Sequence, residues 1–159
     1  ATALDDLVVG ATSDDTLNGL AGNDVLHGLD GSDGLLGGSG ADGLFGGDGD
    51  DWLDGGSGND ILVSGAGIAD VAYGGTGADT HVFGEELANG ITETDIIQDY
   101  DPLHDLIDLG GSEITRHVES ENSVVLWAGA DEDVIIVNGA TSLASLVVVD
   151  GSEVSDAVA

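Results

Sequence analysis

A nine-residue repeat runs through the first half of the chain. From Gly10 the sequence divides into units such as GGSGADGLF, GGDGDDWLD and GGSGNDILV, and eight units follow one another to Val82, with Ser64 as one extra residue. The sixth position of every unit is Asp, and the eighth is Leu in the first six units. A fixed short period of this kind indicates a solenoid, in which each unit packs on its neighbours.

Each position of the repeat has a distinct physical role. Glycines at positions one, two and four permit positive φ and close backbone approach, so they form a turn whose carbonyls point inward together. Positions seven to nine suffice only for a short strand, whose side chains alternate, so the Leu at position eight is the inward residue. Two units therefore make one coil of a parallel solenoid with two facing sheets.

The charge balance requires a partner for this array. Asp and Glu number 32 and Lys and Arg number 1, which gives a formal net charge of -31 and opposes compaction. Ordering nine residues costs about 9–18 kcal/mol, and burying one Leu returns only about 1.5–3 kcal/mol. Carbonyl and carboxylate oxygens suit Ca²⁺ better than softer metals. Aspartates that cap turns without a metal are the alternative, and a disordered acidic tail is disfavoured by the regular apolar spacing.

The units resemble the G-G-x-G-x-D-x-U-x nonapeptide of the RTX (repeats-in-toxin) family, a calcium-binding β-helix repeat. The resemblance covers Gly10 to Phe83. It implies a parallel β-roll in which each Ca²⁺ lies between turns two units apart, with about four to six ions in this chain. It also implies the donors: carbonyls of positions two and four with the Asp from one turn, and carbonyls of positions one and three with the Asp from the other.

The resemblance assigns ligands residue by residue. Aspartates two units apart share an ion. The Asp51–Asp70 and Asp60–Asp79 pairs straddle the Ser64 insertion, and the Asp15–Asp33 pair is left out because Ala11 and Ser13 stand where glycines belong. The metal ligands expected from the remaining pairs are Leu20, Gly22, Asp24, Leu29, Gly31, Asp33, Gly37, Gly38, Ser39, Gly40, Asp42, Gly46, Gly47, Asp48, Gly49, Asp51, Gly55, Gly56, Ser57, Gly58, Asp60, Gly65, Gly67, Asp70, Gly74, Thr76 and Asp79.

The chain changes character near residue 84, where the glycine repeat stops and Val and Ile become more frequent. We expect strands at Ser123–Trp127 and Asp133–Val137, and one helical turn in TSLASL. Solenoids need caps because a terminal rung exposes its core and strand edges. The sequence therefore predicts an all-β fold, with a lead-in over 1–9, a parallel β-roll over 10–83, a C-terminal β cap over 84–150 and a tail over 151–159.

The cap segment carries a second resemblance. DTHVF and DIIQDYDPLHDLIDLGG are similar to the segment that ends RTX arrays in serralysin-type proteases, lipases, adhesins and the R-modules of mannuronan epimerases. This implies that Asp101, Asp105 and Asp108 act as late calcium ligands. The final VSDAVA resembles a type I secretion signal of that group.

Side chains outside the ligand set also carry expectations. His81 takes an inward position, where we expect a core histidine rather than a ligand. His27, Phe45 and Val63 fall at position nine with eighteen-residue spacing, so they should stack on one sheet, with Trp52 and other apolar residues on the other sheet. Such strips mark an interface with the chain's own tail or an upstream domain, and a sugar platform is the alternative.

Several function classes are disfavoured. The chain has no Cys and no catalytic motif such as HExxH, so we expect no enzymatic activity and place any catalytic domain outside this chain. A single Arg disfavours nucleic acid and anionic polysaccharide as partners, and no apolar run approaches the roughly 18 residues of a membrane span. Ice binding is rejected because Thr76 is alone at its repeat position.

The sequence predicts a calcium-binding module of an exported bacterial protein that folds when calcium arrives and is structural rather than catalytic. Its expected location is extracellular, and its expected partners are calcium ions and, in transit, the type I secretion machinery. The alternative is a carbohydrate-binding accessory module of a secreted polysaccharide-modifying enzyme such as a mannuronan epimerase. A neutral glycan is then the favoured ligand, because one Arg disfavours alginate.

Overall fold

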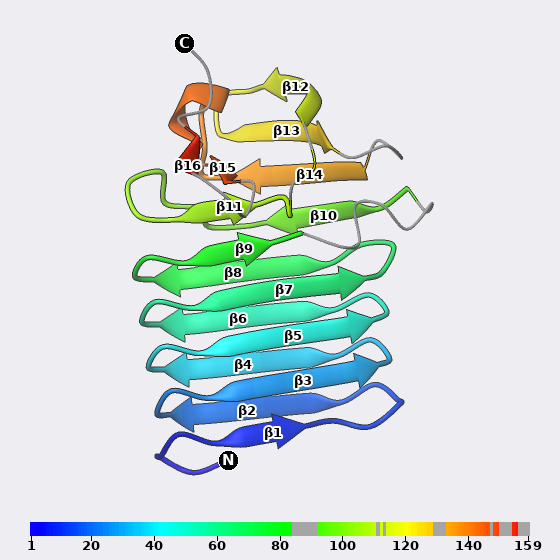
Figure 1. The fold of residues 1–159 in the computed structure, drawn as a ribbon, viewed down its shortest axis with the longest axis vertical. Helices are drawn as coiled ribbons and strands as arrows, with labels where there is room; N and C mark the ends of the chain where they lie inside the picture. The colour runs from blue at the N-terminus through cyan, green and yellow to red at the C-terminus, as the bar shows by residue number, and fades with distance from the viewer. Residues whose placement is uncertain are drawn as a thin grey trace.

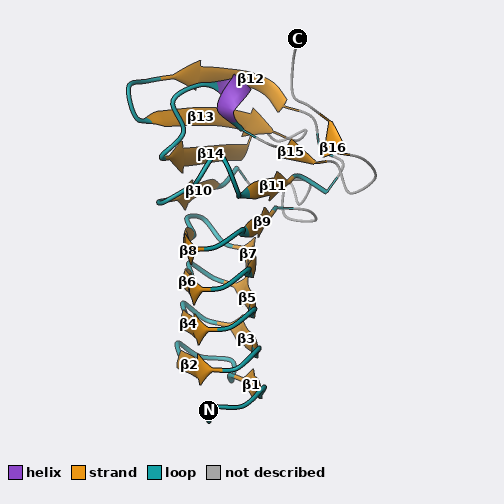
Figure 2. Ribbon diagram, turned by 90° about the vertical axis from the view of Figure 1, so that its left-hand side faces the viewer, coloured by secondary structure: helices purple, strands orange, loops and turns teal. Residues whose placement is uncertain are grey.

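The structure is a computed structural model that describes residues 1–83, 92–110, 112, 114–128, 133–146, 148–149 and 154–155. Its described strands form two sheets of eight strands each. The chain climbs from the N-terminus as a stack of coils, and the two sheets face each other across the roll (Figures 1 and 2). The predicted all-β parallel solenoid is confirmed.

Successive strands of the roll alternate between the two sheets, and each pairs in parallel with the strand two places further along the chain. One sheet contains β1 (Leu7–Val9), β3 (Val25–Asp30), β5 (Gly43–Asp48), β7 (Ile61–Ala66) and β9 (Thr80–Val82). The other sheet contains β2 (Thr16–Ala21), β4 (Gly34–Ser39), β6 (Trp52–Ser57) and β8 (Val71–Thr76).

The strands are longer than the repeat pattern predicted. In β4 the strand includes positions seven to nine and continues through positions one to three of the next unit. Gly38, at position two, has φ 113° and still pairs with Gly56, so the chain bends there without leaving the ladder. A Cβ atom on Gly38 would lie 2.2 Å from the Leu20 carbonyl oxygen, so the coils are too close for a side chain at this position.

The core of the roll is a single column of leucines. Position eight is inward as predicted, and the side chains from Leu26 to Leu62 are at most 1% exposed. Ala72 continues the column, and His81 follows on β9 between its strand neighbours Leu62 and Ile107. Burial lowers the pKa of His81 to about 4, so its ring is neutral in the core, as expected for a histidine in this position.

The C-terminal part continues the same two sheets. In the first sheet β9 is followed by β11 (Leu106–Asp108), β15 (Val148–Val149) and β16 (Val154–Ser155). In the second, β8 is followed by β10 (Thr94–Ile97), β14 (Asp133–Asn138), β13 (Ser123–Ala128) and β12 (Ile114–Glu119). A 3-10 turn, η2, spans Leu143–Ser145.

The two strands and the helical turn expected in this part are confirmed, whereas β12 was not predicted. All but one residue of β12 are exposed, so the strand lacks the alternation of apolar and polar residues by which sequence reveals strands. The expected secretion signal lies mainly outside the described residues, which include only Val154 and Ser155 of that segment.

The C-terminal strands have a hydrophobic core of their own. Phe83, Ile97, Leu126 and Ile135 are at most 1% exposed and belong to a cluster separate from the leucine column. This core contains aromatic and branched side chains from several strands, whereas each rung of the roll contributes one residue. The roll therefore has much less apolar burial per residue than the part of the chain above it.

Candidate metal centre

The aspartates at position six form two continuous columns along the edges of the roll. In each column, the Oδ1 atom of an aspartate accepts a hydrogen bond of 2.7–3.0 Å from the backbone N–H of the aspartate one coil below. The Asp24 column consists of Asp6, Asp24, Asp42, Asp60, Asp79 and Asp105. The Asp33 column consists of Asp15, Asp33, Asp51, Asp70 and Asp95.

The second oxygen of most of these carboxylates has no protein partner. The Oδ2 atom is buried and accepts no hydrogen bond in Asp24, Asp33, Asp42, Asp51, Asp60, Asp70, Asp79 and Asp95. Each of these side chains is at most 3% exposed. A buried, unpaired carboxylate oxygen is strongly unfavourable, so each of these atoms calls for a cation.

The carboxylates at three of the column ends are satisfied by the protein itself. The Oδ2 atom of Asp6 accepts hydrogen bonds from Thr2, and that of Asp15 accepts the Ala11 N–H at 2.6 Å. The Oδ2 atom of Asp105 accepts the Asp101 N–H at 2.7 Å. Among the column carboxylates, the buried oxygens without a hydrogen-bond partner therefore belong to the interior members and to Asp95.

Carbonyl oxygens converge on the same spaces as the unpartnered carboxylates. A point at the missing Cβ of Gly37 lies 2.6 Å from Asp42 Oδ2 and 2.7 Å from the Gly55 carbonyl oxygen. The corresponding point at Gly28 lies 2.2 Å from Asp33 Oδ2 and 2.5 Å from the Gly46 carbonyl oxygen. In each case a carboxylate oxygen and a carbonyl oxygen approach the same glycine, and oxygen donors of these two kinds are the ligands that Ca²⁺ prefers. An all-oxygen donor set of this kind fits Ca²⁺.

Carboxylates alone do not complete any site. Within the described ranges, no group of three or more His, Cys, Asp or Glu side chains is arranged to hold a metal ion. Each candidate site must therefore draw on backbone carbonyls in addition to its aspartates, as the repeat pattern implied. The glycines of the turns favour this arrangement, because they adopt positive φ readily and allow close approach of neighbouring backbones.

Burial raises the pKa of several column carboxyls, including those of Asp42, Asp51, Asp60, Asp70 and Asp79. Desolvation is the largest cause, and the neighbouring carboxylates in the column add to it. The pKa of Asp51, Asp60 and Asp79 rises to about 6, and that of Asp70 rises to about 8. In the absence of a cation, these groups are pushed toward the protonated form.

The predicted carbonyl donors lie in two structural classes. Donors of the first class, at positions two and four, have positive φ: Leu20, Gly22, Leu29, Gly31, Gly38, Gly40, Gly47, Gly49, Gly56 and Gly58. Donors of the second class, at positions one and three, lie in strand ends: Gly37, Ser39, Gly46, Asp48, Gly55, Ser57, Gly74 and Thr76. Their assignment as calcium ligands remains a prediction.

The structure corrects the position of the one-residue insertion. The sequence pattern placed it at Ser64, but Phe45 pairs with Val63 and Gly47 pairs with Gly65, so Ser64 stands at position one. The extra residue lies instead in the turn at 68–69, after which Val71 pairs with Trp52. An insertion in the turn leaves the strand ladder unbroken, whereas one inside the strand would break it.

The correction changes two expected ligands. Gly65 and Gly67 were assigned to positions one and three, but they occupy positions two and four. Positions one and three of this unit are Ser64 and Ala66. Gly65 has the positive φ typical of position two, at 102°, whereas Gly67 lacks the positive φ that position four has in the other turns. The Asp51–Asp70 pair has Ser64 and Ala66 in their former place.

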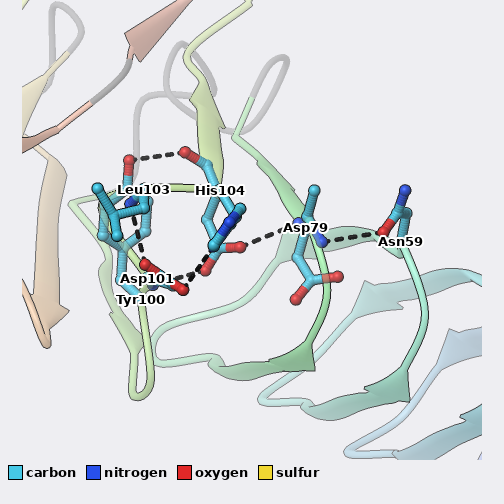
Figure 3. Close-up of polar contacts among 8 residues, drawn as sticks. Asn59, Asp79, Tyr100, Asp101, Leu103 and His104 are labelled. Carbon is cyan, nitrogen blue, oxygen red and sulfur yellow. Dashed lines mark hydrogen bonds and ion pairs between the residues drawn. The ribbon is translucent and has the colours of Figure 1, made fainter.

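The three aspartates of the cap that were expected to bind calcium differ in their hydrogen bonds. Of the three late ligands expected, only Asp105 joins a column, because its Oδ1 atom accepts the Asp79 N–H. Figure 3 shows Asp79 beside the segment that contains Asp101 and His104. Asp101 accepts hydrogen bonds from Leu103 N–H at 2.9 Å and contacts His104 Nδ1 at 2.8 Å. This contact raises the pKa of His104 and lowers that of Asp101. Asp108 accepts the Gly110 N–H at 2.9 Å.

Sequence reasoning missed Asp6 and Asp95 as members of the columns. Neither is preceded by the glycine-rich turn. Both begin an Asp-x-apolar triplet, Asp6-Leu7-Val8 and Asp95-Ile96-Ile97, whose third residue packs in a core. That triplet, without the glycines, is the signal that identifies a rung of the column.

Each outer face carries an aromatic pair, and the spacing predicted the pair of His27 and Phe45. His27 and Phe45 stack with ring centroids 4.6 Å apart and an interplanar angle of 18°. On the other sheet, Trp52 and Tyr73 lie 5.8 Å apart in a tilted arrangement. Among the described residues, no helix is long and apolar enough to cross a membrane.

Comparisons with known proteins agree with this geometry. Residues 1–35, 9–44 and 36–68 match the family of the RTX calcium-binding nonapeptide repeat (4 copies). No curated protein matches the chain.

Two solved structures are similar to the whole fold. The R3 subunit of a mannuronan C5-epimerase from Azotobacter vinelandii has 28% sequence identity and a TM-score of 0.60, and the match covers 96% of this chain and 86% of that subunit. The R2 subunit has 24% identity and a TM-score of 0.50, with 84% of each chain covered, and supports the fold alone. Residues 1–68 of this chain are thus similar to RTX calcium-binding nonapeptide repeats, and they are wound into a parallel β-roll.

Proposed function

We propose that this chain is a non-catalytic module of an exported protein that folds when it binds calcium. The observation that carries the proposal is the set of buried, unpartnered Oδ2 atoms repeated along both columns. The ions are held by the column aspartates together with the carbonyls of the intervening turns. Bound calcium neutralises carboxylates that otherwise repel one another in the same column.

The energetic role of calcium follows from the small core of the roll. Each rung buries about one leucine, so packing alone gives too little to order nine residues. A cation that binds only the folded roll stabilises it by mass action, in proportion to the logarithm of the calcium concentration. Affinities of extracellular calcium modules are in the range of about 10⁻⁴–10⁻³ M, which suits a roll that stays unfolded inside a cell and folds outside.

Export by the type I machinery is part of the same proposal. An unfolded, calcium-free chain can pass a narrow channel, and folding on the far side opposes its return. The RTX repeats and the similarity to an epimerase subunit support an exported protein.

A calcium titration tests the folding role. Far-UV circular dichroism of the chain in EDTA should show little β structure, and adding calcium to millimolar concentration should produce it, with a rise in Tm that continues as calcium increases. Calcium-independent β content and Tm would refute the proposal. The double variant Asp42→Asn, Asp60→Asn removes two of the expected calcium ligands, so it should need more calcium to fold than the wild-type chain.

Carbohydrate binding is the second candidate, and the similarity to a mannuronan C5-epimerase subunit favours it. The net charge of -31 and the single Arg oppose binding of a polyanion such as mannuronan. The stacked His27–Phe45 pair and the Trp52–Tyr73 pair offer apolar ring faces to a neutral sugar. Calorimetry with neutral glycans and with alginate separates the two roles, and tight, salt-sensitive alginate binding would reverse the ranking.

A further inference from the structure

The two aspartate columns end differently where the repeats stop. The Asp24 column ends at Asp105, whose Oδ1 accepts the Asp79 N–H at 3.0 Å and whose Oδ2 accepts the Asp101 N–H at 2.7 Å. Both oxygens of that last carboxylate are satisfied by backbone. The Asp33 column ends at Asp95, whose Oδ1 accepts the Asp70 N–H at 3.0 Å and whose Oδ2 is buried without a partner.

Asp95 therefore repeats the condition of the interior column residues, although it lies outside the nonapeptides. Asp70, one coil below, also has a buried Oδ2 without a partner, and both side chains are 1% exposed. Two buried carboxylates, each with one unsatisfied oxygen, thus lie one above the other at the joint between β8 and β10. This arrangement is the same as that of each aspartate pair inside the roll.

The surroundings of this pair are acidic. Burial is the largest cause that raises the pKa of Asp70 and Asp95. The charges of Glu93 and Asp133 raise the pKa of Asp95 further, and that of Asp50 raises both. Glu93 and Asp133 are 1% and 0% exposed, and the Glu93 N–H donates to Asp133 Oδ1 at 3.0 Å. The single Arg of the chain, Arg116, lies 4.2 Å over the ring of Trp127 on β12 and β13. No basic side chain is among the electrostatic partners of Asp70 or Asp95.

Backbone carbonyls of the turn before Asp70 are the further oxygen donors that we assign to the joint. After the register correction, Gly65 and Gly67 occupy positions two and four of the turn that precedes Asp70. Positions two and four are the positions whose carbonyls face the coil above in the other turns of the repeat. Two backbone hydrogen bonds fix the position of β10 above this turn. Thr94 N–H donates to the Ile68 carbonyl and Ile96 N–H donates to the Asp70 carbonyl, both at 2.9 Å.

We propose that Asp70 and Asp95, with carbonyls of the turn below them, bind one further calcium ion at the joint between the roll and the C-terminal strands. A donor set of carboxylate and carbonyl oxygens selects a hard dication of this kind. β8 and β10 share only the pairs Ile96–Val71 and Ile97–Ala72, so the ion fastens β10 to the roll where strand pairing is short. The inference rests on the proposed calcium binding of the roll, but it concerns an ion that the nonapeptide repeats do not supply.

Counting ions in matched variants tests the proposal. Native mass spectrometry of the wild-type chain at saturating calcium gives the total number of bound ions. Asp95→Asn should bind one ion fewer than wild type. Asp105→Asn, the equivalent change in the other column, should bind the same number as wild type because backbone N–H groups already occupy its oxygens. An unchanged count in Asp95→Asn would overturn the proposal, and so would equal losses in both variants.

A measurement on the wild-type chain covers the case in which a variant fails to fold. A crystal grown with calcium and measured at long X-ray wavelength should show an anomalous peak between the carboxylates of Asp70 and Asp95. Peaks along the roll without a peak at the joint would refute the further site and leave the proposed function intact. The absence of peaks at every position would refute the proposed function itself, so the two failures are distinguishable.

Discussion

Acidification should stabilise the calcium-free roll and destabilise the calcium-bound one. In the metal-free fold, the pKa of Asp51, Asp60 and Asp79 is about 6, that of Asp95 about 7 and that of Asp70 about 8, against 3.8 for an unperturbed carboxyl. Because each folded pKa lies above the unfolded value, the folded chain binds more protons across this window. The stability of the metal-free roll is therefore greatest below pH 3.8 and falls as the pH rises through 6 to 8.

The size of this effect decides whether the apo roll folds at all. One unit of pKa shift corresponds to about 1.4 kcal/mol. Together the five carboxyls lower the stability of the metal-free roll by on the order of 10–20 kcal/mol between low pH and neutral pH. A typical domain has a total stability of about 5–15 kcal/mol, so the loss is comparable with the whole free energy of unfolding. Neutral pH without calcium should leave the roll unfolded.

Circular dichroism across a pH series, with and without calcium, measures this directly. In EDTA, β structure should increase as the pH is lowered from 8 to 5. In saturating calcium the trend should reverse, because protons compete with the ion for the same oxygens. Asp70→Asn removes the carboxyl with the largest rise in pKa, so it should flatten the EDTA curve above pH 6. A metal-free roll whose β content is constant or rises with pH would show that the buried carboxyls are not the source of its instability.

Three further outcomes follow from the packing of the roll. Gly38→Ala should lower stability in saturating calcium by about 3 kcal/mol or more, because φ is 113° and the new Cβ would lie 2.2 Å from the Leu20 carbonyl oxygen. Gly34→Ala in the same strand is the control, because the nearest atom to its new Cβ is 3.9 Å away. Equal shifts in Tm for the two variants would contradict this account. Leu44→Ala should cost about 2–5 kcal/mol and raise the calcium midpoint, whereas Leu103→Ala, at a residue 84% exposed, should change neither, as judged by urea melts at fixed calcium. Magnesium at the same concentration should not restore β structure in circular dichroism, because it requires a tight octahedral shell at about 2.0–2.1 Å that the spaced carbonyls do not form.

The fold of the roll was predictable because each position of its nine-residue repeat has the same structural role in successive coils. The constant Asp and Leu positions determine which side chain turns inward and which oxygen faces the turn, and Leu26 to Leu62 and Asp24 to Asp79 lie as expected. The period of nine also specifies the pairing of alternate units, because two units return the chain to the same sheet. Local chemistry and global topology agree throughout this segment.

The errors occurred where the glycine pattern and the hydrogen-bond ladder disagree. Aligning glycines placed the insertion at Ser64, because Gly65 looks like the start of a unit. The structure keeps the ladder from Phe45–Val63 to Gly47–Gly65 intact and places the extra residue in the turn. Backbone pairing along a strand outweighs the preference for glycine at position one, where Ser64 is accommodated with 2% of its surface exposed.

Beyond the repeats, sequence patterns identified strands better than sites. Asp95 escaped notice because the turn residues that mark the other aspartates are absent before it. Its place in the Asp33 column depends on the position of β10 above β8, which is a tertiary relation. β12 was missed for a different reason, since an exposed strand has no apolar period to detect.

The hydrogen bonds within the columns couple the folding of neighbouring coils. Each interior carboxylate binds the backbone of the coil below and lies beside the space between coils, so an ion that orders one turn also orders the ligands of the next. In a one-dimensional stack of this kind, units gain stability from nearest neighbours and change state together. We therefore expect the roll to bind calcium and fold cooperatively, over a narrow range of calcium concentration, and not to fill its sites one by one.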